Sequence, residues 1–201
     1  MNNESPAPVA ITLASASPRR REILATLGLE FSIAAPDVDE TPLAGEAAED
    51  MVVRLAVAKA EAVRTGSPDI VIAADTAVVV DGRVLGKPED REDCLAMLDA
   101  LSGRTHTVCT GVALHCRDVT HTAMSTTDVL FRDISRDEAL AYWQSGEPQD
   151  KAGAYAIQGL GALFVSHLSG SYSGVMGLPL YETGRLLRRA GIALLAGIDT
   201  V

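Results

Sequence analysis

Residues 13–22 read Leu-Ala-Ser-Ala-Ser-Pro-Arg-Arg-Arg-Glu, which places three arginines at the expected start of a helix. Ser17 is a typical N-cap, Pro18 a typical first helical residue, and Gly28 a stop signal. Cations are unfavourable at a helix N-terminus, because that end already carries partial positive charge. A bound anion would remove this penalty. Serine hydroxyls, free N–H groups and guanidinium groups therefore predict a phosphate-binding corner. The alternative is a solvated basic surface.

Apolar periodicity and turn residues extend this strand, turn and helix unit along the chain. Strands are expected at residues 10–14, 31–35, 70–74, 77–80, 83–85, 105–116, 121–131 and 163–168, and further helices at 46–64, 89–101, 135–144 and 180–190. Gly66, Ser67 and Pro68 are expected to end the first long helix. Because hairpins intervene between helices and strands, we expect an α/β fold with a mixed twisted sheet flanked by helices. Residues 1–9 are expected to form a flexible tail and residues 10–201 a single domain.

Composition narrows the classes of ligand and compartment. The 201 residues are 47% hydrophobic and carry a net charge of −10, which disfavours binding to nucleic acid or to an anionic membrane. A local basic pocket on such an acidic chain suits a small, highly charged metabolite. No apolar stretch is long enough to cross a bilayer. Three cysteines and no recognisable leader predict a cytoplasmic protein without disulfides.

Asp75 is the leading catalytic candidate. It follows five apolar residues, Ile70 to Ala74, on what is expected to be an interior strand that Asp75 and Thr76 interrupt. A buried carboxylate is unfavourable unless a cation, a metal or a hydrogen-bond donor accompanies it. The alternative is an aspartate that caps a turn at the end of the strand.

Two lysines are candidates for contacts with phosphate oxygens. Lys59 shares a helical stripe with apolar and small residues, namely Val52, Leu55, Ala56, Ala62 and Val63. It either contacts a phosphate or extends its apolar stem to the protein edge, leaving the ammonium in water. Lys87, in Leu85-Gly86-Lys87-Pro88, ends a hairpin strand close to Asp75 in the sequence.

Other motifs carry less weight. The acidic group Asp37, Asp39 and Glu40 offers oxygen ligands for Mg²⁺, although a solvated loop is the simpler interpretation. The segment from Gly82 to Gly86 is one residue too short for a Walker loop, and Pro88 replaces its Ser or Thr. A zinc site is disfavoured by the spacing of His106, Cys109, His115, Cys116 and His121, and the chain has no GxSxG elbow.

Five motifs in order resemble the Maf family of nucleoside triphosphate pyrophosphatases over about residues 11–191. They are Leu-Ala-Ser-Ala-Ser-Pro-Arg-Arg at 13–20, Ala-Asp-Thr at 74–76, Leu-Gly-Lys-Pro at 85–88, Asp-Lys-Ala-Gly-Ala-Tyr-Ala-Ile-Gln-Gly at 150–159 and Gly-Leu-Pro-Leu at 177–180. The segment 150–159 resembles the branch that acts on dTTP and UTP. The resemblance implies an α/β, ITPase-like fold with two lobes around a central cleft, a homodimer, and a house-cleaning role toward modified pyrimidine nucleotides.

The resemblance also assigns expected roles. The reaction would release a monophosphate and pyrophosphate with a divalent cation, Mg²⁺, Mn²⁺ or Co²⁺, bound by Asp75 and Glu40. Asp75 matches the family's proton acceptor, and Lys59, Lys87 and Glu40 complete the catalytic set. Substrate contacts are expected from Ser15, Arg19, Arg20, Thr76 and Gln158. The rival interpretations are a non-catalytic nucleotide-binding regulator of septum formation and a hydrolase of sugar nucleotides or phosphate esters.

Independent chemistry agrees with these roles. Attack of water on the α-phosphorus develops negative charge that arginine, lysine and a divalent cation stabilise. A carboxylate at Asp75 would orient or deprotonate the water. The amide of Gln158 offers one donor and one acceptor, which suits the O4 and N3–H edge of uracil or thymine.

Overall fold

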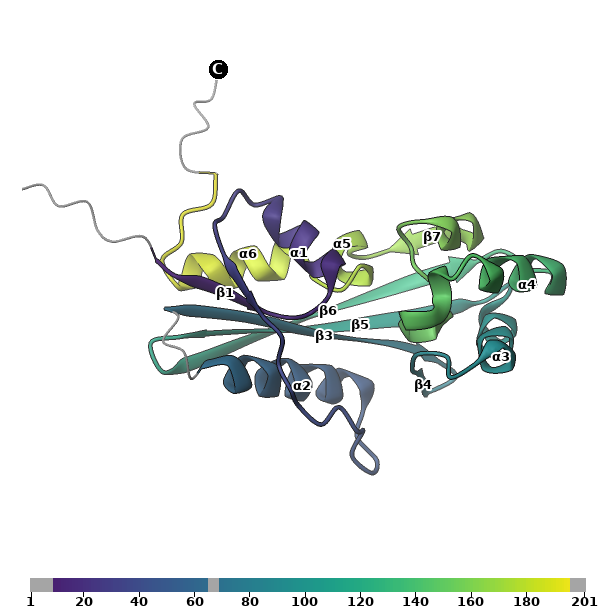
Figure 1. The fold of residues 1–201 in the computed structure, drawn as a ribbon, viewed down its shortest axis with the longest axis horizontal. Helices are drawn as coiled ribbons and strands as arrows, with labels where there is room; N and C mark the ends of the chain where they lie inside the picture. The colour runs from purple at the N-terminus through teal and green to yellow at the C-terminus, as the bar shows by residue number, and fades with distance from the viewer. Residues whose placement is uncertain (1–8, 65–68, 196–201) are drawn as a thin grey trace, which may run out of the picture.

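The computed structural model describes residues 9–64 and 69–195, in which one mixed seven-stranded sheet is flanked by helices (Figure 1). The strand order is β2-β1-β3-β5-β6-β7, with β4 paired to β3. The strands are β1 (Ile11–Ala14), β2 (Ser32–Ala34), β3 (Ile70–Val80), β4 (Arg83–Leu85), β5 (Thr105–Cys116), β6 (Val119–Phe131) and β7 (Val165–Ser169). The expected mixed α/β class is confirmed.

The helices are α1 (Pro18–Ala25), α2 (Ala48–Val63), α3 (Arg91–Leu101), α4 (Arg136–Gln144), α5 (Tyr172–Val175) and α6 (Leu180–Arg189). Three 3₁₀ turns follow α4, at η2 (Glu147–Asp150), η3 (Ala152–Ala154) and η4 (Leu160–Phe164). Helix α2 covers one face of the sheet, and α1, α5 and α6 lie over the other (Figure 1). No described helix has both the length and the apolar character needed to span a membrane.

Strand β3 has one fully paired edge and one interrupted edge. β5 pairs with β3 from Ile70 to Val79. On the opposite edge, β1 pairs only with Ile70–Ile72 and β4 only with Val78–Val80. The stretch from Ala73 to Ala77 therefore has no strand partner on that edge within the described chain. This opening surrounds Asp75.

The expected interruption of the strand at Asp75 and Thr76 is wrong. β3 runs through both residues without a break, because β5 supplies a continuous ladder opposite them. The alternative role for Asp75, capping a turn at a strand end, is excluded by this position.

Local signals account for the helix that opens the fold. Pro18 occupies the first turn of α1, and the side chain of Ser17 accepts a hydrogen bond from the Arg20 amide. Gly28 has a φ of +69°, a conformation that favours glycine, just beyond the helix end. The predicted start and stop are confirmed.

Helix α2 presents a buried stripe to the sheet. Its buried residues are Ala48, Met51, Val52, Leu55, Ala56, Lys59 and Ala60. Val63 is only half-buried, and Ala62, which was expected on the stripe, is exposed in the last turn. The stripe holds α2 against β3 and β5 and fixes the position of Lys59.

Some expected boundaries shift. The β5–β6 turn contains only Arg117 and Asp118, both with positive φ, rather than four residues. A short helix, α5, lies in the glycine-rich segment that was expected to be a loop. The expected helix stop at residues 66–68 lies outside the described residues, as does the expected tail apart from Val9.

Candidate active site

A cavity of about 640 Å³ lies at the open edge of β3. One wall comes from the end of β1 and the start of α1, and another from residues 150–158. All nine candidate site residues line it, namely Ser15, Arg19, Arg20, Glu40, Lys59, Asp75, Thr76, Lys87 and Gln158. The tertiary structure therefore gathers into one cavity residues that are spread over more than half of the chain.

Lys59 joins the two candidate metal-binding carboxylates. Its Nζ lies 2.6 Å from Asp75 Oδ1 and 2.6 Å from Glu40 Oε1. Lys59 is 6% exposed, so its ammonium does not extend into water as one interpretation of the sequence allowed. Burial raises the pKa of Glu40, but the hydrogen bond and charge of Lys59 outweigh burial and leave that pKa below its ordinary value.

Arg20 is held on the other side of the opening. Its Nε donates to the Gly177 carbonyl at 2.8 Å, and its Nη2 donates to Thr76 Oγ1 at 3.2 Å. Burial lowers the pKa of Arg20, and the charges of Asp75 and Glu40 oppose that effect. The guanidinium keeps its charge at any physiological pH.

A line of hydroxyl groups supports this arginine. Thr110 Oγ1 donates to the Gly174 carbonyl at 2.8 Å and lies 3.0 Å from Thr76 Oγ1. Because the single Thr110 proton is used on Gly174, Thr76 donates to Thr110 and accepts from Arg20. Nothing in the sequence pointed to Thr110, since it lies in the middle of an ordinary β-branched strand.

Asp75 and Thr76 reach the same cavity from opposite faces of the sheet. Successive side chains of a strand point to opposite faces. Asp75 meets α2 through Lys59, whereas Thr76 meets α1 through Arg20. The missing strand partner on this edge of β3 lets the cavity receive both faces.

The remaining candidates lie around these pairs. Ser15 is buried, and its Oγ accepts from the Ser17 amide at 3.1 Å, while Lys87 and Gln158 have exposed side chains. Burial lowers the pKa of Arg19, and nearby Asp150 opposes this. Of the three arginines at the start of α1, Arg19 and Arg20 line the cavity, but the exposed Arg21 does not.

Lys151 is a further cation of the cavity to which sequence reasoning gave no role. It pairs with Asp150, and both line the cavity. Its place in the Asp-Lys-Ala-Gly motif was the available signal. Among the residues that the structure describes, five basic and three acidic side chains line the cavity, which favours a ligand with several negative charges.

The donor set fits a hard divalent cation shared with a substrate. Asp75 and Glu40 supply carboxylate oxygens on one side of the cavity. Mg²⁺ is commonly bound by one or two carboxylates together with substrate phosphates. Among residues 9–64 and 69–195, no three His, Cys, Asp or Glu side chains are grouped as a complete metal cage, so the histidines and cysteines of β5 and β6 form no zinc centre there. All three cysteines are free, and Cys94 and Cys109 are buried.

Comparisons with known proteins place the chain among its relatives. Residues 10–190 match the family model described as Maf-like protein. The chain is 53% identical over 192 residues to the dTTP/UTP pyrophosphatase of Methylococcus capsulatus, covering 93% of this chain and 95% of that protein. It is 55% identical over 185 residues to the dTTP/UTP pyrophosphatase of Myxococcus xanthus, covering 92% and 94%.

A solved structure shares the fold. The HAM1 protein from Coxiella burnetii aligns with a TM-score of 0.51 at 19% identity, covering 90% of this chain and all of that one. At this level of identity, the likeness concerns the arrangement of helices and strands alone.

Proposed function

This chain belongs to the Maf family, and we propose that it hydrolyses dTTP and UTP to the monophosphate and pyrophosphate. The observation that carries the proposal is the single cavity at the open edge of β3, which collects the cationic corner, the buried carboxylate and Gln158. The names of the relatives at 53% and 55% identity support the same substrates. A house-cleaning role toward modified pyrimidine nucleotides belongs to this proposal.

The cationic groups bind the polyphosphate. Arg19, Arg20 and Lys87 line the cavity from α1 and from the segment after β4. Guanidinium groups match phosphate oxygens with paired N–H donors, and lysine adds a compact charge. Because Thr76 and Gly177 already hold Arg20, little side-chain entropy is lost when phosphate binds.

Asp75 activates the water. Lys59 engages Oδ1 of Asp75, which leaves the second carboxylate oxygen to orient the nucleophile and accept its proton. The shared ammonium also keeps Glu40 beside Asp75. Positive groups around the α-phosphate then stabilise the charge that grows on its oxygens during attack.

A divalent cation would be held by Asp75 and Glu40. When bound, it would neutralise phosphate charge and polarise the phosphoryl oxygens. Mg²⁺, Mn²⁺ and Co²⁺ all accept oxygen ligands of this kind. The identity of the ion, the homodimer and the cytoplasmic location stay predictions.

Gln158 selects the base in this proposal. Its exposed amide lies on the wall of the cavity formed by residues 150–158. One donor and one acceptor complement the O4 and N3–H edge of uracil or thymine. Guanine carries an equivalent O6 and N1–H pair on a larger, two-ring base, so selection depends on where the cavity wall holds the Gln158 amide. The rival function, a nucleotide-binding regulator without turnover, gives no reason for a buried carboxylate beside the phosphates.

The test is product analysis with one substitution. Purified protein, a panel of triphosphates and Mg²⁺ or Mn²⁺ should yield monophosphate and pyrophosphate from dTTP and UTP, identified by chromatography. Asp75→Asn should lower kcat by about 10²–10⁴-fold, because the base is lost, and leave binding of a non-hydrolysable UTP analogue largely intact.

Asp37→Asn is the matched control. Asp37 is an exposed carboxylate of the same loop as Glu40 and does not line the cavity, so its loss should leave turnover unchanged. Nucleotide binding without product would favour the regulator. Release of inorganic phosphate instead of pyrophosphate would contradict the proposed bond cleavage, and near-normal turnover of Asp75→Asn would remove Asp75 from its role.

A further inference from the structure

Two residues that do not line the cavity, Tyr142 and Glu147, accept hydrogen bonds from the backbone on both sides of Gln158. Before Gln158, the Ala156 amide donates to the Tyr142 hydroxyl at 3.1 Å. After it, the Leu160 and Gly161 amides each donate at 2.9 Å to the Glu147 carboxylate. The contacts therefore enclose Gln158 within a short, irregular stretch of backbone.

Tyr142 and Glu147 are also hydrogen-bonded to each other. The Tyr142 hydroxyl donates to Glu147 Oε1 at 2.7 Å, so its proton and its acceptor oxygen are both used. The Tyr142 ring is 4% exposed and packs edge-on against Phe164, with ring centroids 5.1 Å apart. The hydroxyl thus has a fixed position from which to hold the Ala156 amide.

The negative charge of Glu147 strengthens the hydrogen bonds that it accepts from the backbone. Burial raises the pKa of Glu147, but the hydrogen bonds from Gly161, Leu160 and Tyr142 outweigh burial and leave that pKa below its ordinary value. Glu147 is therefore ionised at neutral pH, and hydrogen bonds to an ionised acceptor are about twice as strong as those between neutral groups.

Gly159 and Gly161 lie too close to Glu147 and Tyr142 for a side chain to fit at either position. A Cβ at Gly159, where φ is +140°, would lie 2.4 Å from Glu147 Oε2. A Cβ at Gly161 would lie 2.5 Å from the Ala156 carbonyl and 2.7 Å from the Tyr142 hydroxyl. Side chains at these positions would push the segment off Glu147 and Tyr142, so the glycines that follow Gln158 are needed for the close approach.

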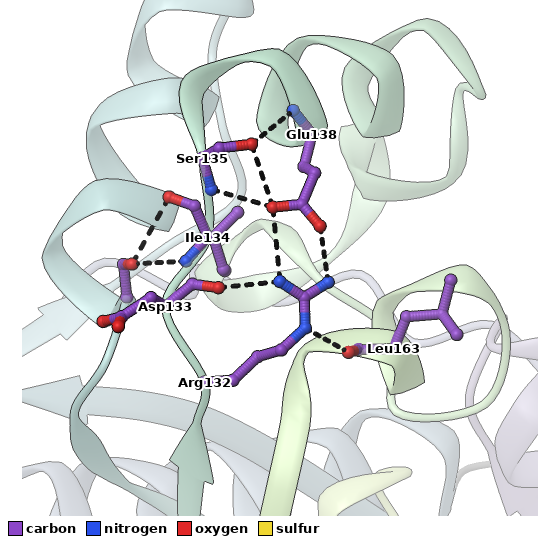
Figure 2. A network of polar contacts seen from close by, with 7 residues as sticks. Arg132, Asp133, Ile134, Ser135, Glu138 and Leu163 are labelled. Atoms are coloured by element: carbon purple, nitrogen blue, oxygen red, sulfur yellow. Dashed lines mark hydrogen bonds and ion pairs between the residues drawn. The ribbon is translucent and has the colours of Figure 1, made fainter.

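A separate network holds the outer part of the same unit. Arg132 donates to the Leu163 carbonyl at 2.9 Å and to both oxygens of Glu138, in the first turn of α4 (Figure 2). Glu138 also completes a capping box with Ser135. This network joins α4 to η4 through hydrogen bonds that do not involve residues 156–161, and it provides a control for general weakening of α4.

We propose that Tyr142 and Glu147 are positioning residues for base selection, holding the Gln158 backbone so that its amide faces the pyrimidine edge. The inference rests on the proposed function, because it needs Gln158 to read the base. It assigns Tyr142 and Glu147 no contact with substrate. Specificity then depends on a preformed segment of backbone, which avoids the loss of loop entropy on binding.

The experiment compares UTP with GTP in the full-length protein. Tyr142→Phe keeps the ring and the local charge but removes the hydroxyl, and Glu147→Gln replaces one acceptor oxygen with a donor. Each should lower the ratio of kcat/KM for UTP to that for GTP by about tenfold. The loss should appear in KM for UTP, with kcat at saturating UTP changed by less than about twofold.

Two comparison variants separate the causes. Gln158→Ala should lose the same preference directly. Glu138→Gln weakens the outer network of Figure 2 and should keep the preference of the original chain. The charge of Glu147 acts on the nearby Arg19 guanidinium, so Glu147→Gln also changes the electrostatics of the cavity. Tyr142→Phe keeps that charge, and it therefore tests the positioning role even if Glu147→Gln does not fold.

The outcomes are distinct. If Gln158→Ala loses the preference while Tyr142→Phe keeps it, the positioning role is overturned and the proposed function stands. An equal loss in Glu138→Gln also overturns it, because any disturbance of α4 would then suffice. If Gln158→Ala keeps the preference, Gln158 does not read the base, and the positioning role is overturned as well. If the unaltered chain cleaves no triphosphate, the proposed function itself is overturned.

Discussion

At the scale of single residues, His106 is a buried titratable group beneath the candidate site. It is 2% exposed, and its Nε2 lies 2.8 Å from the hydroxyl of Tyr155, a residue of the cavity wall. The ring packs edge-on against Phe131 and Tyr155. Burial lowers the pKa of His106 to about 4, from an ordinary value of 6.5. The imidazole is therefore neutral in the folded protein at neutral pH.

This burial predicts a loss of stability in mild acid. Between about pH 6.5 and 4, the unfolded chain binds a proton at His106 and the folded chain does not, so the free energy of unfolding falls as the pH is lowered. The loss should approach about 3 kcal/mol at the lower end. Urea denaturation at several pH values should show the fall, and His106→Gln should flatten it.

The pH window identifies the group. Glu46 and Glu138 have pKa values lowered to about 2, so their loss of stabilisation begins only as the pH falls below about 4.5. A slope between pH 6.5 and 4.5 that persists in His106→Gln would contradict the assignment to His106.

At the scale of elements, the closeness of α2 to the sheet decides where Lys59 lies. Gly111 of β5 pairs in register with Asp75 of β3. A Cβ at Gly111 would lie 2.5 Å from the Val52 carbonyl of α2. The helix backbone therefore rests on the strand at a position where only a hydrogen atom fits, and this closeness lets Lys59 reach Asp75.

Gly111→Ala should lift α2 away from β5. We expect a loss of about 1–3 kcal/mol in the free energy of unfolding, because the clash is with backbone rather than with a flexible side chain. Turnover should fall as well, since the Lys59 contact with Asp75 loosens. Chemical denaturation and steady-state assays with UTP measure the two effects.

Gly86→Ala is the matched control for this substitution. A Cβ at Gly86 would have no atom within 4 Å, so the change should leave stability nearly unaltered. Equal stability of the two alanine variants would show that α2 has room to move at Gly111.

At the scale of the whole molecule, an acidic chain surrounds a cationic cavity. The net charge is −10, yet Arg19, Arg20, Lys59, Lys87 and Lys151 all line one cavity. The net charge of the chain repels a polyanion, whereas the basic side chains of the cavity attract it. Focused fields of this kind raise the association rate of a charged substrate and weaken as salt is added.

We therefore expect kcat/KM for UTP to fall as NaCl is raised at constant divalent cation. Lys87→Gln should lower kcat/KM and make this salt dependence shallower, because Lys87 is an exposed cation of the cavity. Arg83→Gln removes an exposed cation that does not line the cavity and should keep the original slope. Identical slopes in all three proteins would contradict focused attraction by the cavity.

The whole chain shows how far sequence reasoning reaches. Signals that act within a few residues were predicted correctly: the Ser17 cap, Pro18 in the first turn of α1, and Gly28 just beyond the end of that helix. The five short motifs hold seven of the nine candidate residues, Glu40 and Lys59 lie outside them, and the structure gathers all nine into one cavity. These features depend on local backbone geometry or on residue identity, and both are written directly in the chain.

The features that could not be predicted depend on contacts between residues far apart in the sequence. The sequence by itself determined the mixed α/β class, the cationic helix start and the family. Only the tertiary structure decided that β3 runs unbroken through Asp75 and that Lys59 is buried between two carboxylates. It also decided that Thr110 binds the Gly174 carbonyl and that Glu147 binds the Leu160 amide. Each of these features depends on a partner more than ten residues away, and the choice among such partners is made when the whole sheet and its helices pack together.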